Sequence, residues 1–101
     1  TGTAVETSLN GTIEVLVHKD RSLQWPRAET PTHYMSMGLD PDLDEAARMA
    51  TRGMVKFLVE EKDMDPGDAY ILCSVALDLR ITQLVDGTKG VHGMLAKALF
   101  Q

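Results

Sequence analysis

The stretch from Asp65 to Asp86 reads DPGDAYILCSVALDLRITQLVD, and a helical pattern gives way to an extended pattern within it. An Asp-Pro-Gly turn signal is followed by small and apolar residues at helical spacing as far as Ala76, which predicts a short packed helix. After this helix the apolar residues alternate with polar ones, which predicts a strand with one buried face. Asp78 and Arg80 therefore fall at a helix-to-strand junction, where they point the same way and are expected to form a structural ion pair.

A second and longer helix is predicted upstream of this junction. Asp42 or Asp44 can cap its start, and apolar residues then recur at steps of three and four residues as far as Lys62. The stripe expected to face the core consists of Ala46, Ala47, Ala50, Met54, Phe57 and Leu58. At the other end of the chain, the tail from Gly90 to Gln101 fits either a strand or a closing helical turn.

The first 38 residues have the pattern of strands and loop. Apolar and polar residues alternate from Thr3 to Lys19, which predicts two strands or one bent strand. A polar loop containing Trp25 leads to a further strand over 32–37, and a break is expected over 38–42.

These patterns predict a single α+β region over 1–101, with mainly β strands and loop over 1–38 and an α+β portion over 42–101. It comprises edge strands, one long helix, one short helix and a C-terminal β segment.

Composition excludes two classes of partner. The 101 residues carry a formal net charge of −5, and the ten Lys and Arg residues do not cluster, so nucleic acid is not an expected partner. Apolar runs are short and the N-terminus does not resemble a signal peptide, so we expect a soluble cytoplasmic protein with no membrane segment. The single cysteine, Cys73, lies on the apolar face of the short helix and is predicted to be a buried packing thiol.

The methionines are scattered along the sequence, which favours adaptable core filler over a sulfur-ligand site. They are Met35, Met37, Met49, Met54, Met64 and Met94.

Three polar residues are candidates for chemistry. Glu6 lies in a predicted strand of small and apolar residues, so it is either paired with a cation, a metal ion or a reacting group, or simply faces solvent. Glu29 and His33 flank Pro31 at the entry to a strand, where a carboxylate and an imidazole could share proton transfer or ligate zinc. The spacing alone favours the alternative, in which both are residues of a surface loop without a chemical role.

Five blocks in this order resemble the C-terminal part of the acetamidase/formamidase family. They are GTAVE (2–6), LQWPRAETPTHYMSMG (23–38), DLDEAARMA (42–50), DAY (68–70) and DLRITQLVD (78–86). The resemblance covers nearly the whole chain, although Leu77 stands where many family members have glycine. It implies that this chain is a C-terminal fragment of a larger, mainly β amidase.

The resemblance also implies an activity. Family members hydrolyse small linear amides, such as formamide and acetamide, to ammonia and a carboxylate, with a site that gathers carboxylates and histidine as a metal-dependent hydrolase does. Glu6 matches the family's Gly-Thr-Ala-x-Glu block and is implied as a metal ligand or general base. Glu29 and His33 match the Glu-Thr-Pro-x-His block, and the implied cofactor is a divalent metal ion, with zinc as the candidate and Glu6 and His33 as ligands.

Two classes of function follow. In the first, the chain is part of an amidase that is inactive without its N-terminal part, with a small amide as substrate and a homo-oligomer as the expected assembly. In the second, it is a non-catalytic assembly or interaction module, because its first predicted strand would leave an exposed edge when isolated. We expect the isolated chain to be inactive and to self-associate.

Overall fold

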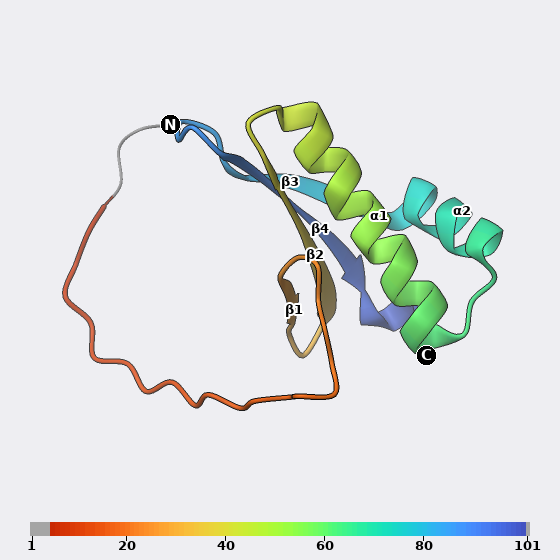
Figure 1. The fold of residues 1–101 in the computed structure, drawn as a ribbon, viewed down its shortest axis with the longest axis horizontal. Coiled ribbons are helices and arrows are strands. Elements are labelled where there is room, and N and C mark those ends of the chain that lie inside the picture. The colour runs from red at the N-terminus through yellow and green to blue at the C-terminus, as the bar shows by residue number, and fades with distance from the viewer. Residues whose placement is uncertain (1–4, 101) are drawn as a thin grey trace.

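A computed structural model describes residues 5–100 of the chain. Its centre is a four-stranded antiparallel sheet with the strand order β1-β2-β4-β3, and two helices pack on one face of this sheet (Figure 1). The elements in chain order are β1 (Arg27–Glu29), β2 (His33–Asp40), α1 (Leu43–Lys62), α2 (Pro66–Ala76), β3 (Asp78–Gln83), β4 (Lys89–Ala96) and a short 3-10 helix, η1 (Lys97–Phe100). The α+β fold expected from the sequence is therefore confirmed.

The long helix α1 forms where the sequence predicts it. The side chain of Asp42 caps its start by accepting hydrogen bonds from the backbone amides of Asp44 and Glu45 at 2.8 and 3.3 Å. The helix ends at Asp63, which adopts a left-handed conformation with φ 53° and whose amide donates to the carbonyl of Leu58. Both ends therefore have partners for backbone groups that a helix leaves unpaired.

The Asp42 cap provides a direct test of this helix start. We expect Asp42→Ala to lower the free energy of unfolding by about 1 kcal/mol, because two amides of the first turn lose their acceptor. Urea denaturation followed by circular dichroism measures this change. The matched control is Asp20→Ala, in the exposed N-terminal segment, which should change stability by less than about 0.5 kcal/mol. Equal effects of the two substitutions would contradict the capping role.

The helix-to-strand junction forms where the sequence predicts it, but the buried face expected for the strand is wrong. Leu79 and Ile81 are 45 and 55% exposed, because β3 is an edge strand of the sheet and the helices pack mainly on β2 and β4. Asp65 caps α2 through the amide of Gly67 at 2.8 Å, and Pro66 occupies the first turn. The helix ends at Ala76, and β3 begins two residues later at Asp78. The tail combines the two alternatives that its sequence left open, since β4 is followed directly by η1.

The core lies between α1, α2 and the sheet. Its larger cluster of buried residues contains Met54, Leu58, Ala69, Cys73 and Leu95. Its smaller cluster contains Ala46, Ala50 and Val91. Small residues therefore line the start of α1, where the helix backbone approaches β2 at Gly38.

The strand β1 lies within the polar loop expected from the sequence, because Arg27–Glu29 pair with residues 34–36 across a tight turn. One boundary also differs from the prediction. The break expected over 38–42 begins only after Asp40, because β2 continues through Gly38, which pairs with Val91. Gly38 lies directly under α1, where an added Cβ atom would stand 2.0 Å from the carbonyl oxygen of Ala46. Glycine marks close approach of helix and strand here, and not a turn.

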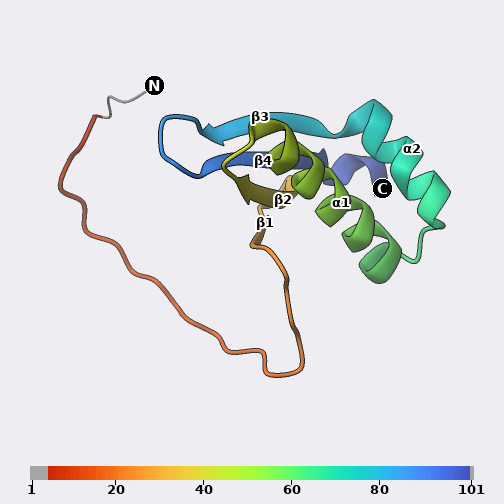
Figure 2. The same ribbon diagram turned by 45° about the horizontal axis from the view of Figure 1, so that its top comes forward.

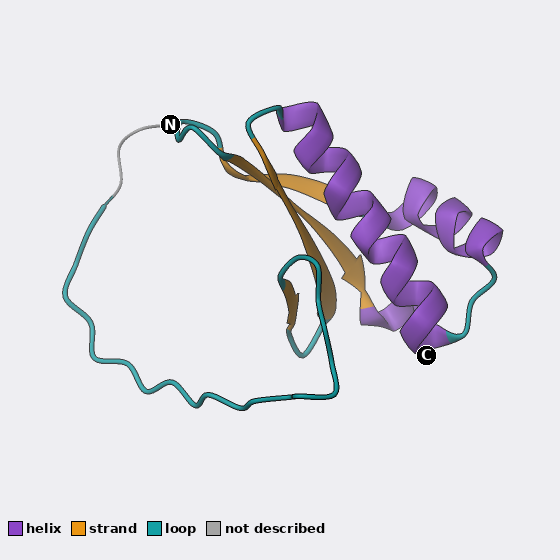
Figure 3. Ribbon diagram, in the orientation of Figure 1, coloured by secondary structure: helices purple, strands orange, loops and turns teal. Residues whose placement is uncertain are grey.

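The strands expected from Thr3 to Lys19 are absent from the described part of that range. Residues 5–26 contain no helix or strand and arc away from the sheet (Figures 2 and 3). The alternating side chains of Ile13, Val15 and Val17 are 88, 81 and 77% exposed. The physical reason is that a strand is held by hydrogen bonds to a neighbouring strand, and no backbone of residues 5–100 pairs with this segment.

Some sequence predictions lie outside the described residues. Thr3, together with Gly2 and Ala4 of the first family block, is one such case, and Gln101 at the end of the tail is another. Within residues 5–100, no helix is both long enough and apolar enough to cross a membrane.

Candidate functional site

Glu6 lies in the extended N-terminal segment, far along the chain from the sheet. Its side chain is exposed, and among residues 5–100 no ion pair or hydrogen bond involves it. Within residues 5–100, this exposure agrees with the alternative in which Glu6 faces solvent. Its assignment as a metal ligand or general base stays a prediction.

Glu29 and His33 lie on either side of a tight turn between β1 and β2. The amide of Thr30 donates to the carbonyl of His33 at 2.9 Å, and the amide of His33 donates to Oγ1 of Thr30 at 3.0 Å. Glu29 pairs directly with Tyr34, so these two side chains lie on the face that carries α1. His33 precedes Tyr34 in the strand and therefore points to the opposite face. The four-residue spacing thus places the carboxylate and the imidazole on opposite faces of the sheet.

Glu29 is paired with a lysine that the sequence did not single out. Nζ of Lys97, at the start of η1, donates a hydrogen bond to Oε1 of Glu29. This hydrogen bond, together with the positive charge of Lys97, holds the pKa of Glu29 below its ordinary value. Glu29 is therefore a carboxylate at neutral pH and a weak base while Lys97 remains beside it.

We expect Lys97→Met to raise the pKa of Glu29 toward the ordinary glutamate value, as measured by NMR titration of its carboxyl carbon. Because the folded pKa is lowered, the pair stabilises the fold above the unfolded pKa, and this contribution is lost as the pH falls through the folded pKa. Stability of the variant should consequently fall less steeply in acid. Lys56→Met, which removes a lysine paired with Glu60, is the control and should leave the Glu29 titration unchanged. An unshifted Glu29 pKa in Lys97→Met would contradict the assignment.

Next to this ion pair lies a cluster of three aromatic rings around one lysine, which we name the Lys62 cluster. Tyr34 and Phe57 have ring centroids 4.8 Å apart, and Phe100 lies edge-on to Tyr34 at 6.0 Å. Nζ of Lys62 donates to the hydroxyl of Tyr34 at 2.7 Å and lies 4.5 Å from the centroid of that ring. Sequence reasoning missed this cluster, because its members come from β2, α1 and η1 and no local spacing links them.

His33 is oriented by its neighbour. Its Nδ1 shares a hydrogen bond of 2.9 Å with Oγ1 of Thr32, so Nε2 is the ring nitrogen available for a proton or a ligand. Within residues 5–100, no three side chains of the His, Cys, Asp or Glu type gather closely enough to hold a metal ion.

A cleft of about 360 Å³ lies between residues 22–27, α1 and the part of β2 from Ser36 to Asp40. Its volume is within the range of small-molecule sites. The residues that give it chemical character are Trp25, Arg27, Asp40, Glu45, Arg52 and Lys56. Because both signs of charge line it, the cleft suits a small polar molecule better than a strongly charged one.

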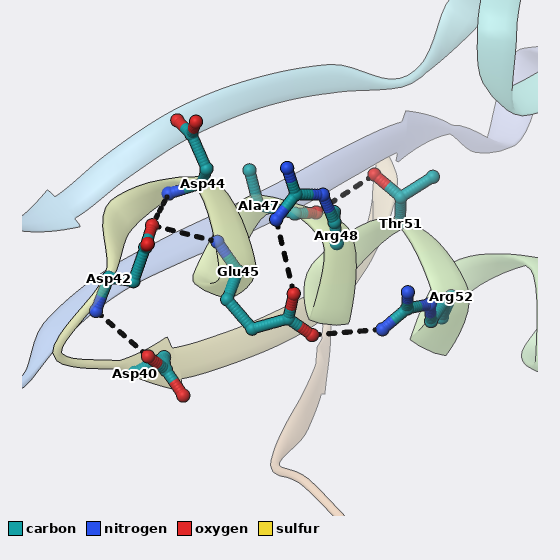
Figure 4. Close-up of polar contacts among 8 residues, drawn as sticks. All are labelled: Asp40, Asp42, Asp44, Glu45, Ala47, Arg48, Thr51 and Arg52. Atoms are coloured by element: carbon teal, nitrogen blue, oxygen red, sulfur yellow. Dashed lines mark hydrogen bonds and ion pairs between the residues drawn. The ribbon is translucent and has the colours of Figure 1, made fainter.

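The α1 wall of this cleft is fixed by a polar network, shown in Figure 4. Glu45 accepts hydrogen bonds from Arg48 at 3.2 Å and from Arg52 at 2.9 Å. Asp40 accepts from the amide of Asp42 at 2.8 Å, which ties the end of β2 to the start of α1. Sequence reasoning missed this cleft. The local signal that could have indicated it is Trp25-Pro26, since proline holds the preceding chain extended.

Two further predictions concern single features. Asp78 and Arg80 form the expected ion pair, with Nη2 of Arg80 2.7 Å from Oδ2 of Asp78, but both side chains are more than half exposed. The pair lies on β3, an edge strand of the sheet.

Cys73 is a buried packing thiol as predicted, and burial raises its pKa, which keeps the thiol protonated.

Comparison with solved structures finds acetamidases. An acetamidase from Yersinia enterocolitica superposes with a TM-score of 0.79 and 35% sequence identity, covering 82% of this chain and 25% of that one. An acetamidase from Bacillus halodurans gives a TM-score of 0.73 and 34% identity, covering 81% of this chain and 28% of that one. A recombinant predicted acetamidase/formamidase from Thermoanaerobacter tengcongensis shares the fold at 22% identity, with a TM-score of 0.73 over 81% of this chain and 27% of that one.

No protein-family model matches the chain, and comparison with curated proteins finds no match. The chain spans about a quarter of the length of the solved acetamidases that it matches. Fold and sequence identity agree over more than four-fifths of this chain. It belongs to the acetamidase/formamidase family and corresponds to a C-terminal part of its members.

Proposed function

We propose that this chain is part of an amidase that hydrolyses small linear amides, such as acetamide and formamide, to ammonia and a carboxylate. The observation that carries the proposal is the 35% identity to the Yersinia enterocolitica acetamidase over 82% of this chain. Because the chain spans only a quarter of that enzyme, we propose that hydrolysis also requires the N-terminal part of the same enzyme. A cytoplasmic location and a homo-oligomeric assembly belong to the same proposal.

Within this amidase we propose catalytic roles for Glu6, Glu29 and His33. His33 suits proton transfer, because Thr32 occupies Nδ1 and leaves Nε2 free. Glu29 is ionised, and it accepts a proton readily only when Lys97 moves away, because the pairing lowers its pKa. Glu6 would act after its extended segment docks on residues outside this chain.

We also propose that a divalent metal ion, with zinc as the candidate, binds at Glu6 and His33. Carboxylate oxygen and imidazole nitrogen are ligands that zinc accepts. In the described residues these two side chains lie on separate segments, so they do not form a site by themselves. Further ligands must therefore come from outside residues 5–100.

A chimera tests the proposal. The matching quarter of the Yersinia enterocolitica acetamidase is replaced by this chain, and ammonia release from acetamide and formamide is measured for the chimera and for the chain alone. We expect activity from the chimera and none from the isolated chain. Activity of the isolated chain would overturn the requirement for the N-terminal part. A folded but inactive chimera would contradict the amidase assignment.

Single substitutions in the chimera test the residue roles. We expect Glu6→Gln, Glu29→Gln and His33→Asn each to lower kcat by about 100-fold or more, since general acid–base groups contribute on this scale. The matched control is Glu14→Gln in the exposed N-terminal segment, which should leave kcat unchanged. A substitution that leaves kcat at the level of this control removes that residue from the mechanism.

A second candidate function, a non-catalytic assembly module, is favoured by one observation. Ile13, Val15 and Val17 are exposed in an extended segment, and β3 is an edge strand whose outer side is unpaired in the described chain. Such a segment and such an edge are suited to pair with another chain. We expect the isolated chain to self-associate, and sedimentation showing a clean monomer would contradict this.

A further inference from the structure

The face of the sheet opposite the helices carries three methionines and a histidine side by side. On β2, Ser36 donates to the carbonyl of Ala50 in α1, and Gly38 lies against the same helix. The residues between and beside them, Met35 and Met37, therefore point to the other face. On β4, Val91 and Leu95 are buried in the helix-facing core, so His92 and Met94 also point to the other face.

The register of the two strands places these four side chains next to one another. Met35 is directly opposite Met94, and Met37 is directly opposite His92. Opposite residues have Cβ atoms about 5 Å apart, and neighbours on the same face of one strand are about 7 Å apart. Each methionine has three rotatable side-chain bonds, so the donor atoms can converge above the centre of this quadrilateral. The sequence favoured scattered core filler, but three of the six methionines gather here.

The histidine is already positioned for a ligand role. Its Nδ1 shares a hydrogen bond of 2.7 Å with Oγ1 of Thr82 on β3. This contact leaves Nε2 as the free ring nitrogen and fixes the orientation of the ring, as supporting hydrogen bonds do at metal-binding histidines.

The charged and titratable neighbours on this face do not prevent cation binding. Arg80 lies opposite His92 and Asp78 lies opposite Met94, but the two are paired at 2.7 Å, so the arginine charge is compensated. His33 is on the same face, opposite Ala96 and one same-face position beyond Met35, outside the quadrilateral.

From this arrangement we propose that the open face of the sheet binds one soft monovalent metal ion, Cu(I), through the thioethers of Met35, Met37 and Met94 and Nε2 of His92. Thioether sulfur selects soft ions, whereas Mg²⁺, Ca²⁺ and Mn²⁺ prefer oxygen ligands. The ion binds by simple coordination without change of oxidation state. This site is separate from the divalent metal proposed for amide hydrolysis and does not depend on that function.

Anaerobic competition against a chromophoric Cu(I) chelator tests the site on the full chain. We expect one Cu(I) per chain. Met94→Leu and His92→Gln should each weaken binding by about tenfold or more, and Thr82→Val, which removes only the orienting hydrogen bond, by about tenfold. Leucine conserves the volume of methionine, so the fold is expected to persist, which circular dichroism checks. Met64→Leu and His18→Gln, which change the same residue types away from this face, should leave the affinity within about twofold.

A second measurement identifies the ligands. Titration with Ag(I), a redox-inert stand-in for Cu(I), should shift the NMR methyl signals of Met35, Met37 and Met94 and leave that of Met64 unchanged. The proposal is overturned if no Cu(I) is retained against the chelator, if the control variants weaken binding as much as Met94→Leu, or if the shifted methyl signals belong to other methionines.

Discussion

Gly38→Ala is expected to lower the free energy of unfolding by about 3 kcal/mol, although it adds a single methyl group. The new Cβ would stand 2.0 Å from the carbonyl oxygen of Ala46 and 2.8 Å from the amide nitrogen of Ala50. Both are backbone atoms of α1, so no side-chain rotation relieves the overlap, and the helix must move away from β2. Because small domains are marginally stable, this loss removes a large part of the total.

Urea denaturation of Gly38→Ala beside Gly87→Ala measures the effect. Gly87 lies in the connection between β3 and β4, where an added Cβ meets no atom within 4 Å. The free energy of unfolding of Gly87→Ala should be unchanged or slightly higher, because alanine reduces the conformational freedom of the unfolded chain. If both variants unfold at the wild-type urea concentration, the close approach of α1 and β2 is wrong.

Leu58→Ala is the second substitution with a large expected effect. Leu58 is fully buried in the cluster with Met54, Cys73 and Leu95, which joins both helices to β4. Removing its side chain loses buried apolar surface and leaves a cavity, which costs about 2–5 kcal/mol. Thermal or urea unfolding measures the loss.

The chain offers the same substitution in an exposed place as a control. Leu9 is 86% exposed in the N-terminal segment, so Leu9→Ala should change stability by less than about 0.5 kcal/mol. Comparable losses for Leu9→Ala and Leu58→Ala would show that the N-terminal segment packs into the core of the isolated chain, contrary to the structure.

Local sequence predicted α1, α2 and the helix-to-strand junction because their signals are local. The Asp42 and Asp65 caps, the apolar stripe of α1 and the alternation of β3 each lie within one element. The same reasoning failed for residues 5–19, where alternation is present but no strand within residues 5–100 pairs with the segment. Alternation states which residues suit a strand, whereas hydrogen bonds to a second strand decide whether one forms.

For the candidate site, too, the sequence predicted individual residues but not the contacts between them. The sequence identified Glu29 and His33 and the family to which they belong, but the register Glu29 to Tyr34 sends the two side chains to opposite faces. The sequence could not reveal that Lys97, 68 residues after Glu29 in the chain, pairs with Glu29 and lowers its pKa.

By itself the sequence determined the α+β class, the limits of both helices, the buried thiol of Cys73 and the kinship with acetamidases, because each rests on local periodicity or on ordered residue blocks. Only the tertiary structure decided which side chains meet. The tertiary structure places the pair of Asp78 and Arg80 on an edge strand, where both side chains are exposed to solvent. It also places Met35, Met37, His92 and Met94 on one face of the sheet. The reason is that strand register and helix packing join residues far apart in the chain, and no local pattern encodes those contacts.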